Sequence, residues 1–423
     1  MHKLSEKMNQ YIFPALSTYY EEPLVLEKGE GKYLYDDAGR QYLDFFGGIL
    51  TVSMGHCNPE IISRVVEQVR TLQHTSTVYI IRPMVELAEQ IARIAPGKLQ
   101  KCFFVNSGTE ADETAVLLST IYTGNDEIVA LRHAYSGRSA LAMSLTAHAP
   151  WRQGKALWAN VKHAHSPYCY RCAFGRTYPN CDLECAKDIE ELICTSTSGR
   201  IAAFIAEPIQ GVGGFITPPK EYFAEAVSII RKYGGLFIAD EVQTAWGRTG
   251  GKMFGIEHWG VEPDIMTFAK GLANGAPIGA VIATSEVADS WHGPTISTFG
   301  GNPVSMVAAQ ATLDLIVKND IPAHVEKVGA RLREGLLRLQ EKYECIGDVR
   351  GMGLMQALEL VGENKVPAPD LVLKVFENTK DLGLLIGKGG LYNNVIRLTP
   401  PMIVTESDVD QAVEILDKAF ALL

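Results

Sequence analysis

Long hydrophobic runs are absent from this 423-residue sequence. Its longest apolar segments, 201–209 and 277–284, are far shorter than the ~18 residues that a membrane-spanning helix needs, and they suit buried strands. The first ten residues, MHKLSEKMNQ, carry charges throughout and lack the apolar core of a signal peptide. We therefore expect no membrane association, no export and a cytoplasmic location.

Basic residues and cysteines are also scarce. Lysine and arginine number 39 against 49 aspartates and glutamates, which gives a formal net charge of −10. Nucleic acid is therefore not expected as a partner, because affinity for its phosphates requires basic patches. Eight cysteines are too few for a disulfide-stabilised scaffold and fit a reducing compartment.

The sequence does contain the composition of a globular protein, with 47% hydrophobic and 21% charged residues. Helical periodicity is visible in segments 59–72 and 83–95. Short apolar runs then alternate with helical segments, at 101–106, 127–132, 201–208, 235–241, 264–270 and 278–284. This alternation predicts βαβ units in an α/β fold with a mostly parallel sheet.

The two ends of the sequence differ from this middle part. Residues 1–30 are predicted to form a helical or irregular arm. Segment 31–45 is predicted to form a hairpin, because its alternation breaks at turn residues 36–39. Near the other end, the sequence predicts an amphipathic helix at 321–343, short strands and a terminal helix at 406–421.

These changes of pattern suggest how the chain divides into domains. At about 150 residues per domain, its length allows two or three of them. We expect a large cofactor-binding α/β domain at 60–323. The N-terminal arm, 1–59, and the C-terminal segment, 324–423, would together form a smaller α+β domain.

Three ionisable residues stand at the carboxyl ends of predicted strands: Glu207, Asp240 and Lys270. Each alone could simply begin a surface loop. Ligands of open α/β sheets bind beyond the carboxyl ends of the strands, so three such residues at one edge are hard to attribute to coincidence. This edge is the predicted active site.

Lys270 and Asp240 together indicate a particular cofactor. A lysine that follows a buried strand among small residues can be partly desolvated, which lowers its pKa and makes the amine nucleophilic. A carboxylate at the ring nitrogen of pyridoxal phosphate keeps the pyridine protonated, and Asp240 is placed to supply it. The pair therefore favours pyridoxal phosphate.

The phosphate of that cofactor needs a cradle, and segment 104–113 offers one. A strand is followed there by Ser107, Gly108 and Thr109, and then by a helix whose free N–H groups attract anions. Ser107 and Glu110 also fit a capping box, which is the purely structural interpretation. The presence of Asp240 and Lys270 downstream favours the phosphate site.

The chain resembles the class III pyridoxal-phosphate-dependent aminotransferases, in particular their alanine–glyoxylate and omega-transaminase branch. The resemblance implies an aspartate-aminotransferase-like fold. It covers nearly the whole sequence and rests on ordered motifs: GGI…GH (47–56), SGTEA (107–111), HAYSG (133–137), AEPIQG (206–211), ADEVQT (239–244), AKG (269–271), TFGGNP (298–303), GDVRGMGL (347–354) and IRLTPPM (396–402).

The resemblance also implies roles for individual residues. Lys270 would form a Schiff base with the cofactor and move the proton at the substrate carbon, while Asp240 would pair with the ring nitrogen. The other implied cofactor contacts are Gln243 at the ring hydroxyl, Tyr135 on the ring face with Gly137 beside it, Glu207, and Ser107, Gly108 and Thr109 at the phosphate. Thr298 would reach the phosphate of a partner subunit, which implies a homodimer with shared active sites, or a tetramer of such dimers.

The same resemblance implies how substrates bind. Arg397 matches the carboxylate-binding arginine of the family, and Glu207 matches the acid that can pair with it. Aromatic residues suggest an apolar pocket wall: Tyr19, Tyr20, Phe45, Phe46 and Trp246. We therefore expect a ping-pong transaminase that moves an amino group from an amine or a β- or ω-amino acid to pyruvate or glyoxylate.

Three alternatives remain at this point. The first is an acetylornithine or 4-aminobutyrate type of aminotransferase that uses 2-oxoglutarate. The second is a pyridoxal-phosphate-dependent phospho-lyase, which would need an additional basic pocket. The third is a catalytically silent binding protein, which the set of Lys270, Asp240 and Tyr135 argues against.

A cysteine cluster stands outside this scheme. Four thiols fall within segment 166–185, in a CxxC–x8–CxxxC pattern: Cys169, Cys172, Cys181 and Cys185. Such spacing can enclose tetrahedral zinc, but it also suits a loop of reduced thiols or an adventitious disulfide. We expect no catalytic metal, because the segment lies away from the predicted strand ends.

Overall fold

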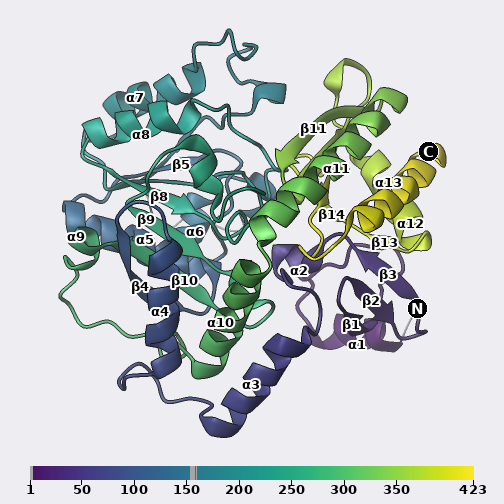
Figure 1. Cartoon of the computed structure of the whole chain (residues 1–423). Helices are drawn as coiled ribbons and strands as arrows, with labels where there is room; N and C mark the ends of the chain where they lie inside the picture. Colours follow the sequence, from purple (N-terminus) through teal and green to yellow (C-terminus); the bar gives the residue numbers. More distant parts are fainter. Residues whose placement is uncertain (1–2, 153–157, 159) are drawn as a thin grey trace.

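The computed structural model describes residues 3–152, 158 and 160–423. Figure 1 shows a larger body around one sheet and a smaller body near which both chain ends lie. The larger sheet has seven strands in the order β4-β10-β9-β8-β7-β5-β6. Their bounds are β4 Leu99–Val105, β5 Ile128–Leu131, β6 Val161–Ala164, β7 Ala203–Ala206, β8 Leu236–Asp240, β9 Ile265–Phe268 and β10 Gly279–Thr284.

The prediction of an α/β fold with a mostly parallel sheet is confirmed. Strands β5 to β9 pair in parallel, whereas β10 runs antiparallel to both β9 and β4. Residues 269–278 join β9 to β10 and contain only the short helix η4 (Lys270–Ala273), whereas a parallel pairing would need a longer crossover. The edge strand β6 was not predicted, because its sequence, VKHA, is only half apolar and mostly half-buried.

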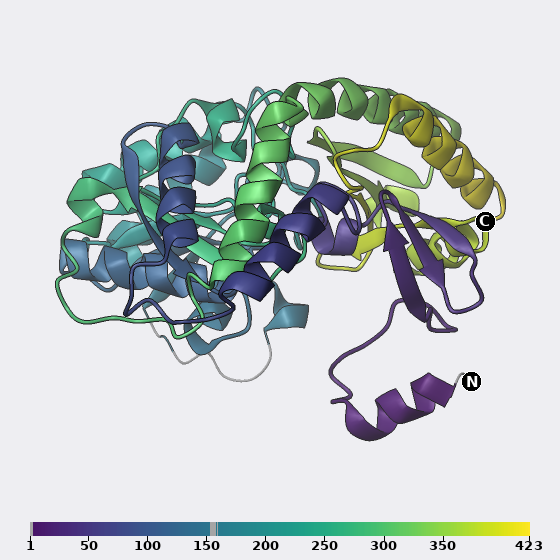
Figure 2. The same cartoon turned by 60° about the horizontal axis from the view of Figure 1, so that its bottom comes forward.

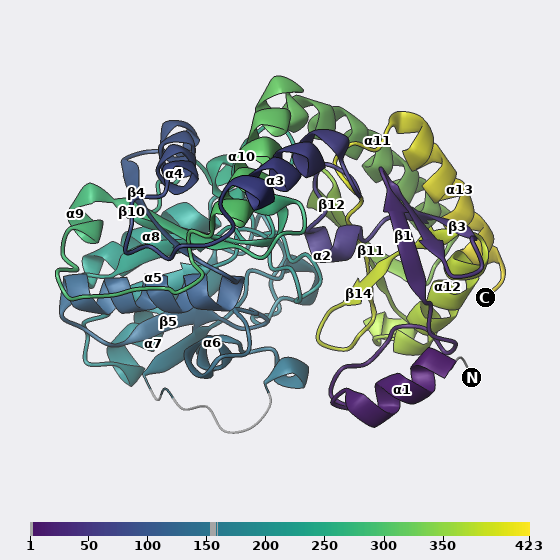
Figure 3. The same ribbon diagram turned by 90° about the horizontal axis from the view of Figure 1, so that it is seen from below.

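Side chains on the central strands alternate between two helical layers. Ile238 of β8 packs with α5 (Gly108–Thr123), while Phe237 faces the opposite layer with α8 (Tyr222–Lys232). Figure 3 shows α5 on one side of the sheet and α4 (Arg82–Ile94) with α10 (Pro303–Lys318) on the other. Because both faces are covered, the central strands β5, β7, β8 and β9 are buried throughout and almost wholly apolar.

The smaller body combines segments from both ends of the chain. Its first sheet contains β1 Leu26–Glu30, β2 Tyr33–Asp36, β3 Gln41–Asp44 and β13 Leu384–Leu385; its second contains β11 Ile346–Met352, β12 Met355–Leu360, β15 Val395–Leu398 and β14 Gly387–Gly389. The predicted hairpin is confirmed as β2 and β3, and β13 pairs in parallel with β3. The predicted arm is partly wrong, since β1 pairs with β2 as a third strand.

The remaining α-helices are α1 Lys3–Tyr11, α2 Gly47–Leu50, α3 Pro59–Thr71, α6 Ala140–Leu145, α7 Glu184–Ser196, α9 Ser285–Ala288, α11 Ile321–Lys342, α12 Pro369–Asp381 and α13 Glu406–Ala421. The helices predicted at 59–72, 83–95, 321–343 and 406–421 correspond to α3, α4, α11 and α13. Figure 2 shows α1 apart from both bodies, and none of its residues is buried. Over the described residues, no helix is long and apolar enough to cross a membrane.

Candidate active site

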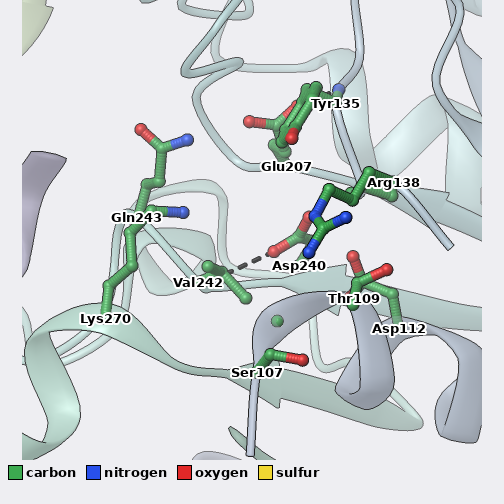
Figure 4. Close-up of a pocket in the computed structure, with 13 residues that line it drawn as sticks. Ser107, Thr109, Asp112, Tyr135, Arg138, Glu207, Asp240, Val242, Gln243 and Lys270 are labelled. Carbon is green, nitrogen blue, oxygen red and sulfur yellow. Dashed lines mark hydrogen bonds between the residues drawn. The ribbon is translucent and has the colours of Figure 1, made fainter. Parts of the chain in front are cut away.

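The strand register brings Glu207, Asp240 and Lys270 together. Asp240 ends β8 in the same row as Ile238, so its side chain points to the α5 face. Glu207 follows β7 in the row of Ile205 and points the same way. Lys270 begins the turn after β9. All three line one cavity of about 220 Å³, drawn in Figure 4.

Most residues predicted to contact a cofactor line this cavity. They are Ser107, Gly108, Thr109, Tyr135, Gly137, Glu207, Asp240, Gln243 and Lys270. The exception is Thr298, which is exposed and lines a separate hollow with Asn106 and Phe299. A single copy of the chain therefore places the other eight residues of this set around Lys270. Thr298 lies outside the cavity.

The cavity floor is the start of α5. Ser107 caps the helix by accepting a hydrogen bond from the Glu110 N–H, and Glu110 in turn accepts one from the Asn106 N–H at 2.6 Å. Only half of the predicted capping box is formed, because Glu110 accepts from the N–H of Asn106 and not from that of the N-cap residue Ser107. Gly137 adopts φ 128°, and a Cβ there would lie 2.4 Å from Thr109 Oγ1. The N–H groups of Gly108 and Thr109 take no part in this cap and are available to an anion.

Burial determines the charges inside the cavity. It lowers the pKa of Lys270, although Asp240 and Glu207 act in the opposite direction. Burial raises the pKa of Glu207 to about 8 and that of Asp240 to about 6. Lys270 also has φ 37°, a backbone conformation that costs energy in a residue with a side chain and that often marks functional positions. The lowered pKa favours the neutral, nucleophilic form of this amine.

Polar atoms on the cavity wall still lack partners. Gln243 Oε1 is buried and has no hydrogen-bond partner. The Gln243 amide packs so closely on Gly211 that a Cβ there would lie 2.3 Å from Nε2. The Tyr135 N–H donates to Glu207 Oε1 at 3.1 Å. An amine, a buried carboxylate, an unpaired amide oxygen and an open helix terminus together fit pyridoxal phosphate.

Arg397 of β15 lies beside this cavity without lining it. Its Nε donates to the Lys388 carbonyl at 2.9 Å and its Nη1 to the Gly211 carbonyl at 3.3 Å. The Gly211 N–H donates to Glu207 Oε2 at 2.7 Å. Within the described part of the chain, Glu207 and Arg397 form no direct ion pair, contrary to our expectation. They are connected through the Gly211 peptide instead.

Aromatic rings surround the Arg397 guanidinium. Its central carbon lies 5.7 Å from the ring centre of Phe46 and 5.6 Å from that of Phe215. Tyr19 contacts Phe46 at 5.7 Å between ring centres. Burial lowers the pKa of Arg397, and Tyr19 partly offsets the effect. Phe46 and Tyr19 thus lie near Arg397, although neither lines the cavity of Lys270.

The three other aromatic residues of the predicted pocket wall lie elsewhere. Trp246 is only 2% exposed and packs in the core, 4.7 Å from Phe268 between ring centres. Its large apolar side chain is buried, so it does not line the cavity. Tyr20 packs against Phe376 at 5.9 Å. Phe45 is fully buried.

Sequence reasoning missed two charged residues of the cavity wall, Asp112 and Arg138. Arg138 directly follows the HAYSG motif, and Figure 4 shows its guanidinium reaching into the cavity. Asp112 directly follows SGTEA. Ser139 was also missed, and its hydroxyl lies 2.6 Å from Thr109 Oγ1. Adjacency to the motifs was the available signal for all three.

The cysteine segment lies apart from this cavity. Its four thiols are free: Cys169, Cys172, Cys181 and Cys185. Burial raises the pKa of Cys169 to about 11 and that of Cys185 to about 12, so these thiols stay un-ionised at neutral pH. In residues 3–152, 158 and 160–423, no three or more His, Cys, Asp or Glu side chains are grouped to hold a metal ion. The segment is anchored by Tyr168 and Arg171, which both hydrogen-bond Glu359 of β12.

Comparisons with known proteins identify the family. The chain is 42% identical over 414 residues to alanine–glyoxylate aminotransferase 2 homolog 2, mitochondrial, of Arabidopsis thaliana, covering 97% of this chain and 86% of that protein. It is 38% identical over 408 residues to the acetylornithine aminotransferase of Caldanaerobacter subterraneus subsp. tengcongensis, covering 95% and 96%. The structure of the omega transaminase from Pseudomonas jessenii in complex with PMP superposes with a TM-score of 0.91 at 31% identity, covering 99% and 98%. Residues 16–420 match the family Aminotransferase class-III. The chain therefore belongs to the class III aminotransferases, and its cofactor is pyridoxal 5′-phosphate.

Proposed function

We propose that this aminotransferase moves an amino group from an amine, or from a β- or ω-amino acid, to pyruvate or glyoxylate. The two substrates would bind in turn at one site, in a ping-pong sequence. The observation that carries the proposal is the buried guanidinium of Arg397 between Phe46 and Phe215. One cation suits one carboxylate, and aromatic walls suit an uncharged donor.

Pyridoxal phosphate, when bound, stabilises negative charge at the reacting carbon and carries the amino group between substrates. Lys270 Nζ would hold the cofactor and, when free, accept the proton from the substrate carbon and return it. Its lowered pKa suits this task, because a neutral amine can act as a base. Asp240 would keep the ring nitrogen protonated, while Gln243 and Tyr135 orient the ring.

The phosphate would bind at the N-terminus of α5, held by Ser107, Gly108 and Thr109. We assign a further contact to Thr298 of a second copy, because Thr298 is exposed and lies outside its own chain's cavity. The assembly would be a homodimer with two shared sites, or a tetramer of such dimers.

Thr298→Ala tests the shared site. The substitution should weaken cofactor affinity about tenfold, the typical effect of losing one hydrogen bond to a charged group. Cofactor affinity of the unchanged protein should fall on dilution as dimers separate. A monomer by light scattering that retained the cofactor and full activity would contradict this assignment.

A second candidate function is transfer of the amino group to 2-oxoglutarate. It is supported by the relative named acetylornithine aminotransferase and by Arg138, which lines the cavity and could meet a second carboxylate. The side chain of Arg138 is exposed, however, whereas Arg397 is 4% exposed. Desolvation strengthens charge pairing, so the buried Arg397 favours the mono-carboxylate acceptors.

A substrate panel tests the choice. β-Alanine and 1-phenylethylamine would each be combined with pyruvate, glyoxylate and 2-oxoglutarate, and kcat/KM measured. Alanine would be combined only with glyoxylate and 2-oxoglutarate, because alanine and pyruvate give no net reaction. We expect pyruvate or glyoxylate to exceed 2-oxoglutarate by about tenfold or more, since an unmatched second carboxylate must be desolvated. A preference for 2-oxoglutarate would replace the proposal with the acetylornithine or 4-aminobutyrate type.

We also propose a cytoplasmic location, which cell fractionation would test. The relative from Arabidopsis thaliana is named as mitochondrial, so recovery in an organelle fraction would contradict us.

A further inference from the structure

Asp112 is a buried carboxylic acid for which neither the motifs nor the proposed mechanism has a role. It lies in the first turns of α5 and is 1% exposed. Its Oδ1 accepts a hydrogen bond from Thr267 Oγ1 at 2.7 Å. Thr267 lies in β9 directly beside Asp240 of β8 in the strand register. The hydroxyl that fixes Asp112 therefore sets its carboxyl next to that of Asp240.

The surroundings of Asp112 disfavour ionisation of both Asp112 and Asp240 at the same time. Three ionisable groups act on it from the strand ends: Glu207 after β7, Asp240 on β8 and Lys270 after β9. Burial and the neighbouring Asp240 raise the pKa of Asp112 well above its usual value, and Lys270 offsets little of this. Two carboxylates in contact away from water cannot both ionise, so one must keep a proton.

The environment of Asp240 indicates which of the two carboxyl groups keeps the proton. Burial raises the pKa of Asp240 to about 6, and a hydrogen bond with Asp112 acts in the opposite direction. Asp240 Oδ1 already accepts the Val242 N–H at 3.1 Å. A carboxylate that receives donors from its protein side is held ionised and oriented.

We propose that Asp112 is an un-ionised acid that donates its proton to Asp240, and so positions the Asp240 carboxylate for the ring nitrogen of the cofactor. Asp112 is thus a positioning residue. The role that we propose for it rests on the proposed role of Asp240. Thr267 Oγ1 donates its hydrogen bond to Oδ1 of Asp112. The other oxygen, Oδ2, would carry the proton and face Asp240.

Substitutions separate this role from simple packing. Asp112→Asn keeps a donor of the same shape, whereas Asp112→Leu keeps the bulk but removes the donor. Ser119→Ala is the matched control, since Ser119 is also buried on α5 and donates only to the Ala115 carbonyl. Each purified protein would be freed of cofactor and titrated with pyridoxal phosphate and with its 1-deaza analogue, in which carbon replaces the ring nitrogen.

Asp112→Leu should weaken pyridoxal phosphate binding about tenfold, the loss expected for a hydrogen bond to an ionised group. Asp112→Asn and Ser119→Ala should bind like the unchanged protein. The effect of Asp112→Leu should largely disappear with the 1-deaza analogue, because that ligand has no nitrogen to meet Asp240. Equal losses for both ligands would mean a packing role and overturn the proposal.

The pH dependence of cofactor affinity gives a second readout. Without its donor, Asp240 takes up a proton more easily, so the acidic fall in affinity should move to higher pH in Asp112→Leu and stay in place in Asp112→Asn. Infrared difference spectra of unchanged protein against Asp112→Asn at neutral pH should contain the carbonyl band of an un-ionised carboxylic acid. Absence of that band would overturn the proposal.

These results distinguish the two levels of inference. If the unchanged protein bound pyridoxal phosphate and its 1-deaza analogue equally, the role proposed for Asp240 would fail. If it preferred pyridoxal phosphate but Asp112→Leu behaved like the control, the role of Asp112 alone would fail.

Discussion

The cavity around Lys270 and the surroundings of Arg397 meet at the Gly211 peptide, but they are assembled differently. Glu207 holds the N–H of Gly211 from the cavity side, and Arg397 holds its carbonyl from the other side. The cavity is made by residues that follow neighbouring strands of one sheet. Arg397 instead meets groups from three segments far apart in the chain, represented by Phe46, Phe215 and Lys388.

This difference explains why the cavity around Lys270 can serve every substrate, whereas the surroundings of Arg397 can select among substrates. Strand ends and a helix terminus fix backbone positions closely, which suits a cofactor shared by many reactions. Contacts between distant segments can change one at a time without disturbing the sheet. We therefore expect variants on the cavity side to affect all substrates alike, and variants around Arg397 to affect one substrate more than another.

Lys270→Ala should have the largest effect and should not discriminate between substrates. Turnover should fall by about 10³-fold or more with every donor and acceptor, because proton transfer alone contributes about 10²–10⁴-fold. The exposed Lys252→Ala is the control. Borohydride reduction followed by peptide mapping would identify the lysine that holds the cofactor, and a label on any other lysine would refute the assignment.

Arg397→Ala should affect the oxo-acid substrate more than the amine substrate. Loss of a charged, forked hydrogen bond should lower kcat/KM for pyruvate by about 10-fold or more, while KM for 1-phenylethylamine changes little. Arg397→Lys should recover only part of the loss, since an ammonium cannot make the two-pronged contact. Arg338→Ala, at an exposed position, controls for loss of charge. Equal losses with amine and oxo acid would assign Arg397 a structural role.

The sequence predicted the cavity side well, because its chemistry coincides with pattern boundaries. Glu207, Asp240 and Lys270 each follow an apolar run, and an apolar run followed by a charged residue is visible without a structure. Ser107 was predicted for a similar reason, since helix caps have characteristic residues at fixed spacing.

Other features depended on packing between segments and could not be read from the sequence. Asp112 occupies a helical position at which a carboxylate would normally be solvated, and only the covering of the sheet by α5 buries it. Trp246 follows a cofactor motif, but the turn after β8 directs its ring into the core. Strand β6 is recognisable only through its pairing with β5.

Glu207 joins the two sides, and a smaller effect is expected from its ionisation. Burial raises its pKa from 4.5 to about 8, so the folded, cofactor-free protein binds a proton that the unfolded chain has already released. Stability must then fall as pH rises between about 4.5 and about 8. Glu207→Gln cannot ionise, so its melting temperature should drop less between about pH 5.5 and about pH 8.5, by about 2 °C or more. Calorimetry of the cofactor-free proteins would measure this, with the exposed Glu344→Gln as control. Asp240 and Asp112 titrate in both proteins, so the difference between the two curves isolates Glu207. Parallel curves would mean that Glu207 stays ionised, and that the cavity and Arg397 are linked by a charge rather than by a neutral acid.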